Sequence, residues 1–197
     1  MRVFISVEIP EGAKEKFTSI NNLLRRNNLP LKLVRIGNLH LTLKFLGEIS
    51  EERLKEIIKS CQIIGQQFSP FSLSFKGIGI FPSIKEPRVI WAGVEEGAEG
   101  LKKINRLLEE ELEKKDFPRE EREFQGHLTI ARVKRPMIRN EALKDLIRKF
   151  EDYQFCSFPV SYFNVMESQL KKEGPIYTCL KEIKLARLKP RTTSGSI

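Results

Sequence analysis

The feature that most constrains the fold is a tetrapeptide that occurs twice, as His40-Leu41-Thr42-Leu43 and as His127-Leu128-Thr129-Ile130. The two copies contain the only two histidines of the chain. Polar and apolar residues alternate in both copies, which is the pattern of a β-strand with one buried face. Because residues i and i+2 of a strand point the same way, each copy presents an imidazole and a hydroxyl side by side and turns its apolar residues to a core.

The elements around the two tetrapeptides also repeat. Hydrophobic periodicity predicts strands at 2–8, 33–34, 40–46, 71–81, 88–95, 124–133, 155–170 and 176–188. It predicts helices at 11–28, 51–65 and 98–115, and a last helix that is capped by Asn140 and ends at about 150. Each half therefore reads as a helix, a His-x-Thr strand, a helix and two strands, and the first half adds an opening strand. The short connections favour hairpins, so we expect an α+β fold with a duplicated unit, antiparallel sheets and helices packed outside.

Length and charge bound the class of protein. The chain has 197 residues, which suggests one domain, here 1–188, followed by a frayed polar tail at 189–197. No apolar run approaches the roughly 20 residues that span a membrane, and Glu8 interrupts the N-terminal strand too early for a signal peptide. We therefore expect a cytoplasmic protein. The net charge of +9 suits either a solvated surface or a partner that carries phosphates.

The three cysteines do not form the pattern of a disulfide framework. Cys61, Cys156 and Cys179 are odd in number and far apart, and the chain has no C-x-x-C motif. This pattern disfavours a disulfide scaffold and a zinc knuckle, so we expect buried free thiols.

The paired His-x-Thr strands suggest acid–base chemistry. If the two strands meet across a cleft, a neutral imidazole faces a protonated one, and two hydroxyls can donate to an anion between them. Two other interpretations are weaker. Two histidines without a carboxylate or thiolate on the same face form a poor metal site, and half-buried histidines with satisfied hydrogen bonds would not need to occur as a matched pair.

The paired motifs resemble those of the two-histidine (2H) phosphoesterase superfamily, and within it the RNA 2′,3′-cyclic phosphodiesterase or 2′-5′ RNA ligase family. The likeness covers almost the whole chain. It is carried by the segments 2–7, 38–48, 81–93 and 124–132. One departure is Gly126, which stands where the family usually has proline before the second histidine.

The resemblance implies a bilobal fold with pseudo-two-fold symmetry and a central cleft. It implies hydrolysis of an RNA 2′,3′-cyclic phosphate to a 2′-phosphate without metal, cofactor or ATP. By this likeness His40 is the proton donor to the leaving 3′ oxygen and His127 the acceptor from water, while Thr42 and Thr129 bind the phosphate oxygens. The near-symmetry of the motifs leaves the direction of proton transfer open on physical grounds. A 5′-hydroxyl in place of water would form a 2′-5′ linkage.

Charged neighbours of the motifs extend the predicted site. Lys44 follows on the His40 face and Arg132 lies five residues after His127, so either could contact phosphate or be a solvated charge. Arg35, Arg88 and Arg135 fit a rim that attracts RNA.

Three aromatic residues have two interpretations. Phe45, Phe124 and Trp91 could stack a base, but core packing is the expected role.

The expected partner is RNA with a 2′,3′-cyclic phosphate end or a small cyclic nucleotide, with no membrane or protein partner, and the protein is expected to be a monomer. Two alternatives remain. The chain could be a non-catalytic RNA-binding module, or a 2H phosphoesterase that acts on another cyclic or 2′-5′ linked nucleotide. Matched imidazoles favour chemistry, because binding alone would not require them.

Overall fold

The computed structural model describes residues 1–137 and 141–186. The strands are β1 (Arg2–Glu8), β2 (Leu31–Leu33), β3 (His40–Glu48), β4 (Phe71–Pro82), β5 (Pro87–Val94), β6 (His127–Val133), β7 (Gln154–Val160), β8 (Tyr162–Lys171) and β9 (Gly174–Lys184). The helices are α1 (Glu11–Lys14), η1 (Glu15–Phe17), α2 (Thr18–Arg26), η2 (Ile36–Asn38), α3 (Glu51–Gly65), α4 (Ala98–Glu113) and α5 (Glu141–Phe150).

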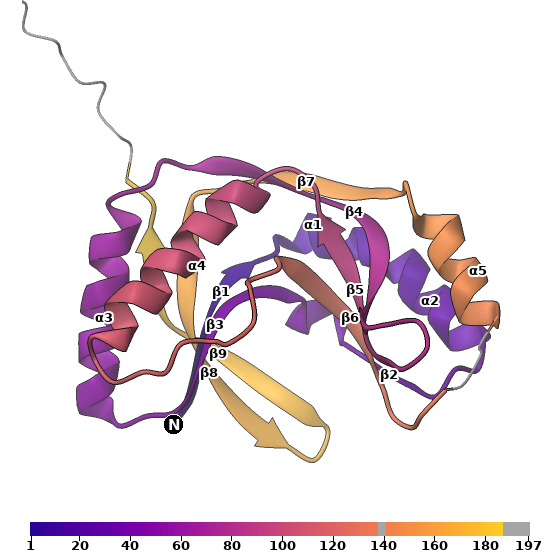
Figure 1. The fold of residues 1–197 in the computed structure, drawn as a ribbon, viewed down its shortest axis with the longest axis horizontal. Coiled ribbons are helices and arrows are strands. Elements are labelled where there is room, and N and C mark those ends of the chain that lie inside the picture. The colour runs from indigo at the N-terminus through magenta and orange to yellow at the C-terminus, as the bar shows by residue number, and fades with distance from the viewer. Residues whose placement is uncertain (138–140, 187–197) are drawn as a thin grey trace, which may run out of the picture.

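All strands join one curled antiparallel sheet in the order β7-β4-β5-β6-β3-β1-β8-β9, with β2 added to β6 (Figure 1). The order is symmetric about the junction of β6 and β3, which pair at Leu128 and Leu41. We call β3, β1, β8 and β9 the first lobe, and β6, β5, β4 and β7 the second lobe. The prediction of an α+β fold built from a duplicated antiparallel unit is confirmed, with both lobes in one continuous sheet.

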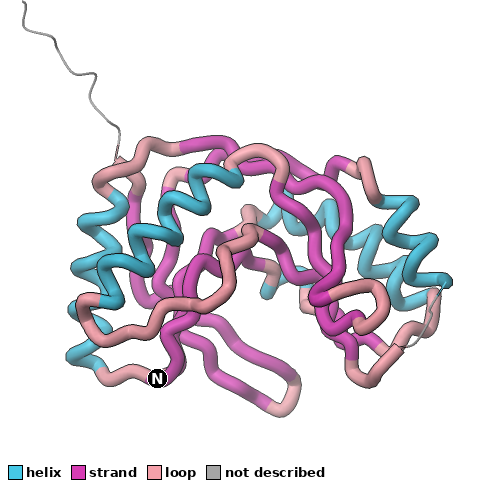
Figure 2. Tube along the Cα trace, in the orientation of Figure 1, coloured by secondary structure: helices cyan, strands magenta, loops and turns pink. Residues whose placement is uncertain are grey.

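The helices pack on the outside of the sheet (Figure 2). Helices α3 and α4 pack together over the first lobe, although α4 comes from the second half of the chain. Helices α1 and η1 pack on β7 and α5 packs on β4, so the N-terminal helical segment covers the second lobe. Phe17 of η1 stacks on Phe155 of β7 with ring centroids 4.7 Å apart. The two lobes are therefore interleaved along the chain.

The apolar residues of both His-x-Thr motifs belong to the core. Leu41 and Leu43 of β3 and Leu128 and Ile130 of β6 are at most 2% exposed. Full burial of such a side chain contributes about 1.5–3 kcal/mol. The core therefore holds the backbone of both motifs in place and leaves the histidines and threonines on the opposite face.

Some predicted boundaries differ. The strand expected at 155–170 is two strands separated at Ser161, where the chain passes from β7 in the second lobe to β8 in the first. Strand-favouring residues lie on both sides of this point, and the one local break signal, Pro159, lies two residues before it and inside β7. The predicted helix at 11–28 contains η1, and β6 begins at His127. The Asn140 cap, the domain end at 188 and the tail at 189–197 lie outside the described residues.

Within the described part of the chain, no helix has the length and apolar character needed to cross a membrane. Cys61 is buried, and burial raises the pKa of its thiol to about 12. Cys156 is half-buried and Cys179 is exposed, so the prediction that all three thiols are buried is wrong for Cys179. Its strand, β9, lies at the edge of the sheet.

Candidate active site

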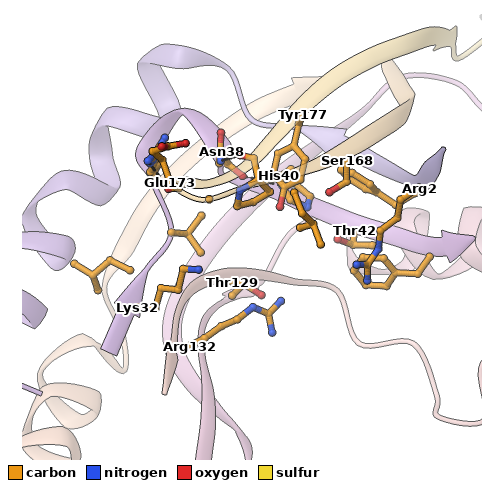
Figure 3. A pocket seen from close by; sticks show the side chains of 18 of the residues that line it. Arg2, Lys32, Asn38, His40, Thr42, Thr129, Arg132, Ser168, Glu173 and Tyr177 are labelled. Atoms are coloured by element: carbon orange, nitrogen blue, oxygen red, sulfur yellow. Dashed lines mark hydrogen bonds between the residues drawn. The ribbon is translucent and has the colours of Figure 1, made fainter. Parts of the chain in front are cut away.

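The junction of β3 and β6 brings the two motifs together. Because the strands pair at Leu41 and Leu128, the flanking polar residues face the same side of the sheet. His40, Thr42, His127 and Thr129 all line one pocket of about 540 Å³. Figure 3 shows His40 and Thr42 of β3 facing the same space as Thr129 of β6.

Both imidazoles are fixed by the same local hydrogen bond. The Nδ1 of His40 lies 2.8 Å from the carbonyl oxygen of Asn38, and the Nδ1 of His127 lies 2.7 Å from that of Gln125. A carbonyl only accepts, so each Nδ1 carries the proton and donates it. The Nε2 of each ring is then the nitrogen left for chemistry, as acceptor when the ring is neutral and as donor when it is protonated.

The surroundings favour the neutral form of both rings. Burial lowers the pKa of His40 and of His127, and the positive charge of Arg132 lowers both further, while the carbonyl hydrogen bonds act in the opposite direction. Aromatic rings pack against both imidazoles. Phe4 and Tyr177 each lie 4.9 Å from the His40 ring, and Phe81 lies 5.0 Å from the His127 ring, centroid to centroid.

A β-bulge follows the threonine of each motif. In the pairing of β3 with β1, Thr42 lies opposite Ser6 and Lys44 opposite Ile5, so Leu43 is an extra residue. In the pairing of β6 with β5, the register shifts in the same way at Ile130. An extra residue reverses the alternation of faces beyond it. In β3 this change buries Lys44 and turns Phe45 to the pocket.

The prediction that Lys44 contacts phosphate is therefore wrong. Lys44 is 3% exposed, and its Nζ lies 2.6 Å from Oε2 of Glu109 on α4 and donates to the carbonyl oxygen of Pro118 at 3.0 Å. Strict alternation placed it beside His40, but the bulge at Leu43 turns its side chain under α4.

The same bulge geometry brings Arg132 into the pocket. Arg35 also lines the pocket, where its guanidinium donates to the carbonyl oxygen of Glu173 in the β8–β9 turn. Arg88 and Arg135 are exposed outside the set of residues that line it. Of the three predicted rim arginines, the structure places only Arg35 at the site.

The three aromatic residues singled out in the sequence do not share one environment. Phe45 is 56% exposed and lines the pocket, so its expected core role is wrong because of the bulge. Trp91 lies 6.2 Å from the His127 ring, centroid to centroid, and Phe124 packs against the core.

Sequence reasoning missed several residues of the pocket. Arg2, Lys32, Asn38 and Tyr177 line it from strands and turns that only the fold brings near the motifs. The register of β2 against β6 places Lys32 directly opposite Arg132, and no local pattern encodes that pairing. Within 1–137 and 141–186, no three His, Cys, Asp or Glu side chains form a group that could hold a metal ion.

The family model described as LigT like Phosphoesterase matches this chain twice, over residues 7–91 and over residues 93–177. The chain belongs to the LigT-like phosphoesterase family. The predicted resemblance is confirmed, and so is the prediction that the chain is a hydrolase. Each of the two matched segments contains one His-x-Thr strand, so the family repeat coincides with the duplicated unit.

Relatives of this LigT-like phosphoesterase align over nearly its whole length. It is 38% identical to the RNA 2′,3′-cyclic phosphodiesterase of Archaeoglobus fulgidus over 181 residues, which is 92% of this chain and 98% of the relative. It is also 38% identical to the protein of the same name from Methanocaldococcus jannaschii over 183 residues, which is 92% of this chain and 99% of the relative.

Solved structures share the fold. TT0787 of Thermus thermophilus superposes with a TM-score of 0.79 at 31% identity and covers 94% of this chain and 98% of its own. LigT of Escherichia coli, crystallised with 3′-AMP, superposes with a TM-score of 0.73 at 24% identity over the same shares. The second likeness concerns the fold alone.

Proposed function

We propose that this LigT-like phosphoesterase hydrolyses RNA 2′,3′-cyclic phosphate ends to 2′-phosphates with His40 and His127 as an acid–base pair. One observation carries the proposal: two imidazoles with fixed Nδ1 protons and free Nε2 atoms line one basic pocket together with two threonine hydroxyls. Its relatives named RNA 2′,3′-cyclic phosphodiesterase point to the same substrate.

In the proposed step, Nε2 of neutral His127 takes a proton from water as the water oxygen bonds to phosphorus. The bond from phosphorus to the 3′ oxygen breaks, and protonated His40 gives its Nε2 proton to that oxygen. The hydroxyls of Thr42 and Thr129 and the guanidinium of Arg132 stabilise the charge on the phosphate oxygens. Bound phosphate also favours the protonated state of the neighbouring imidazole, which offsets the effect of its burial.

A 5′-hydroxyl in the place of water would form a 2′-5′ linkage by the same step without ATP. Breaking that linkage would exchange the roles of His40 and His127, because the reverse path uses each group in its other protonation state. The proposed activity needs no second copy of the chain, since one chain supplies both histidines. A monomer that acts on RNA in the cytoplasm is the form that we propose.

The test is turnover of a nucleoside 2′,3′-cyclic phosphate in excess EDTA, with separation of the 2′- and 3′-phosphate products. We expect metal-independent formation of the 2′-phosphate. Activity that is lost on chelation and restored by zinc or magnesium would contradict the mechanism, and a 3′-phosphate product would indicate a different cleavage. No turnover with retained RNA binding would favour the binding-module alternative.

The direction of proton transfer has its own test. A cyclic substrate with sulfur in place of the bridging 3′ oxygen has a leaving group that needs no protonation. If His40 is the donor, His40→Ala should lose much less activity on this substrate than on the oxygen substrate, whereas His127→Ala should lose similar activity on both. The opposite pattern would exchange the two roles.

A further inference from the structure

The pocket carries more positive charge than one phosphate requires. Four basic side chains line it, and Glu173 is the one acidic residue among its described lining residues. The basic residues are Arg2, Lys32, Arg35 and Arg132. The proposed step uses Arg132 at the cyclic phosphate and Arg35 donates to the β8–β9 turn, which leaves Arg2 and Lys32 without a function.

Lys32 has an unusual neighbour. It lies directly opposite Arg132 in the antiparallel pairing of β2 with β6, and both side chains line the pocket. Like charges in directly opposed positions destabilise a sheet. No acidic side chain of the described chain forms an ion pair with either residue. Water is the main screen between these two exposed charges in the free protein, and a bound anion would offset both.

The position of the pair indicates which anion it meets. Arg132 lies close enough to both imidazoles for its charge to lower both of their pKa values, so it borders the reacting phosphate. Lys32 adds a second positive charge beside Arg132, on the adjacent strand β2. In Figure 3, Lys32 and Arg132 lie on the same side of the pocket, whereas Arg2 lies at another end of it beside Thr42 and Ser168.

We propose that Lys32, with Arg132 beside it, binds a second phosphate of the RNA, the phosphodiester on the 5′ side of the terminal nucleotide. The inference rests on the proposed function for the identity of the ligand as RNA. An ammonium group is a compact cation that binds a phosphodiester without fixed geometry, which suits contact with a flexible chain end. The substrate class is then an oligoribonucleotide with at least two phosphates, bound more tightly than a mononucleotide.

The test measures equilibrium binding of three ligands that need no turnover. They are a nucleoside 2′-monophosphate, a dinucleotide that ends in the same 2′-phosphate, and that dinucleotide with an uncharged methylphosphonate linkage. Wild-type protein should bind the charged dinucleotide more tightly than the other two. Lys32→Gln should reduce the ratio of the charged to the uncharged dinucleotide affinity by about tenfold, since it removes one charged contact.

Two control variants locate the effect. Lys103→Gln removes one charge from an exposed position on α4 and should leave the ratio unchanged. Arg2→Gln removes a charge from the other end of the pocket and should also retain the ratio. The proposal would be overturned if Arg2→Gln, rather than Lys32→Gln, lowered the ratio of charged to uncharged dinucleotide affinity. It would also be overturned if the wild-type protein bound both dinucleotides equally well.

Two further readouts separate this site from folding and from catalysis. The Tm of Lys32→Gln should not fall below that of the wild type, because the substitution removes a repulsion. A lower Tm with unchanged binding would make Lys32 a structural residue and overturn the proposal. Turnover of the mononucleoside cyclic phosphate tests the proposed function by itself, so failure of either idea is visible independently of the other.

Discussion

The strands β3 and β6 carry the same motif and the same bulge, but different groups hold the bulge. In β3 the carbonyl oxygen of the extra residue, Leu43, accepts a hydrogen bond from the side chain of Asn105 on α4 at 2.9 Å. In β6 the carbonyl oxygen of Ile130 accepts from the backbone N–H of Val34 at 2.8 Å. The backbone geometry is duplicated, whereas its support is a helix side chain in one lobe and a loop backbone in the other.

The residues after the bulge differ as well. Lys44, which is buried against Glu109, corresponds to Ala131, and Phe45 corresponds to Arg132. The pocket therefore has an exposed aromatic ring on the β3 side and a cation on the β6 side. The comparison shows that the positions of the histidines and threonines follow from the repeated backbone, while the shape and charge of the pocket come from positions that differ between the two strands.

The largest expected effect tests whether the two lobes contribute equally to chemistry. His40→Ala and His127→Ala should each lower kcat by about 100- to 10,000-fold, the usual contribution of general acid or base catalysis. The double variant should be only slightly worse than either single variant if the two act as a unit. The measurement is turnover of a nucleoside 2′,3′-cyclic phosphate, with circular dichroism to confirm folding, and near-normal turnover in either variant would remove that histidine from the mechanism.

The buried ion pair tests whether β3 depends on a charge that β6 lacks. Glu109→Leu leaves the Lys44 ammonium buried without its partner and should lower the free energy of unfolding by about 3–5 kcal/mol. Lys44→Met combined with Glu109→Leu should restore most of this stability, because Ala131 shows that the second strand needs no charge there. Urea denaturation measures both, and a double variant as unstable as the single one would contradict the explanation.

The support of the bulge gives a smaller effect. Asn105→Leu leaves the buried carbonyl of Leu43 without its donor and should cost about 1–3 kcal/mol of unfolding free energy. In the second lobe the bulge carbonyl is held by the backbone N–H of Val34, and the nearest side-chain support is indirect: Asn21 donates to the carbonyl of Val34 at 3.4 Å. Asn21→Leu should destabilise less than Asn105→Leu by the same urea measurement. Equal effects would mean that the indirect support through Asn21 and Val34 matters as much as the direct bond from Asn105.

The threonines test the symmetry of the phosphate contacts. Thr42→Ala and Thr129→Ala should each reduce kcat/KM by about tenfold, since a lost neutral hydrogen bond is worth about 1 kcal/mol. Similar losses would support equal contacts from both strands. A loss confined to one variant would show that the phosphate sits against one lobe.

The pH dependence should give the smallest effect. Burial lowers the pKa of both histidines, so the kcat/KM profile of the free enzyme should be bell-shaped with its maximum below the ordinary histidine value of 6.5. The two limbs belong to the pair and not to either ring. Arg132→Gln removes a charge that lowers both pKa values, so the maximum should move to higher pH. A rate that rises steadily through pH 9 would contradict the two-imidazole mechanism.

The sequence predicted the positions of the repeated histidines and threonines, but not which side chains face the pocket after the two bulges. His40, Thr42, His127 and Thr129 could be placed because alternation within four residues needs no tertiary information. Strict alternation then put Lys44 in the pocket, but an extra residue at Leu43 reversed the faces. A bulge of this kind is fixed by the partner strand and by α4, and neither is visible in the local pattern.

The remaining misses have a similar cause. Lys32 reaches the site through the pairing of β2 with β6, and Tyr177 reaches it through β9, both far from the motifs in the sequence. The break at Ser161 follows Pro159, a signal that the sequence prediction passed over, and β7 ends there because the chain passes from the second lobe to the first.

The exchange of helices between the lobes means that the unit of repetition is not the unit of folding. A polypeptide with only one repeat would carry a helix whose apolar face has no sheet of its own to cover, and strands that lack both their partner strands and their covering helix. Such a half-length chain could complete both lobes only by exchanging strands and helices with a second copy. The full chain performs that trade within one molecule, so its active site keeps a fixed composition at any protein concentration.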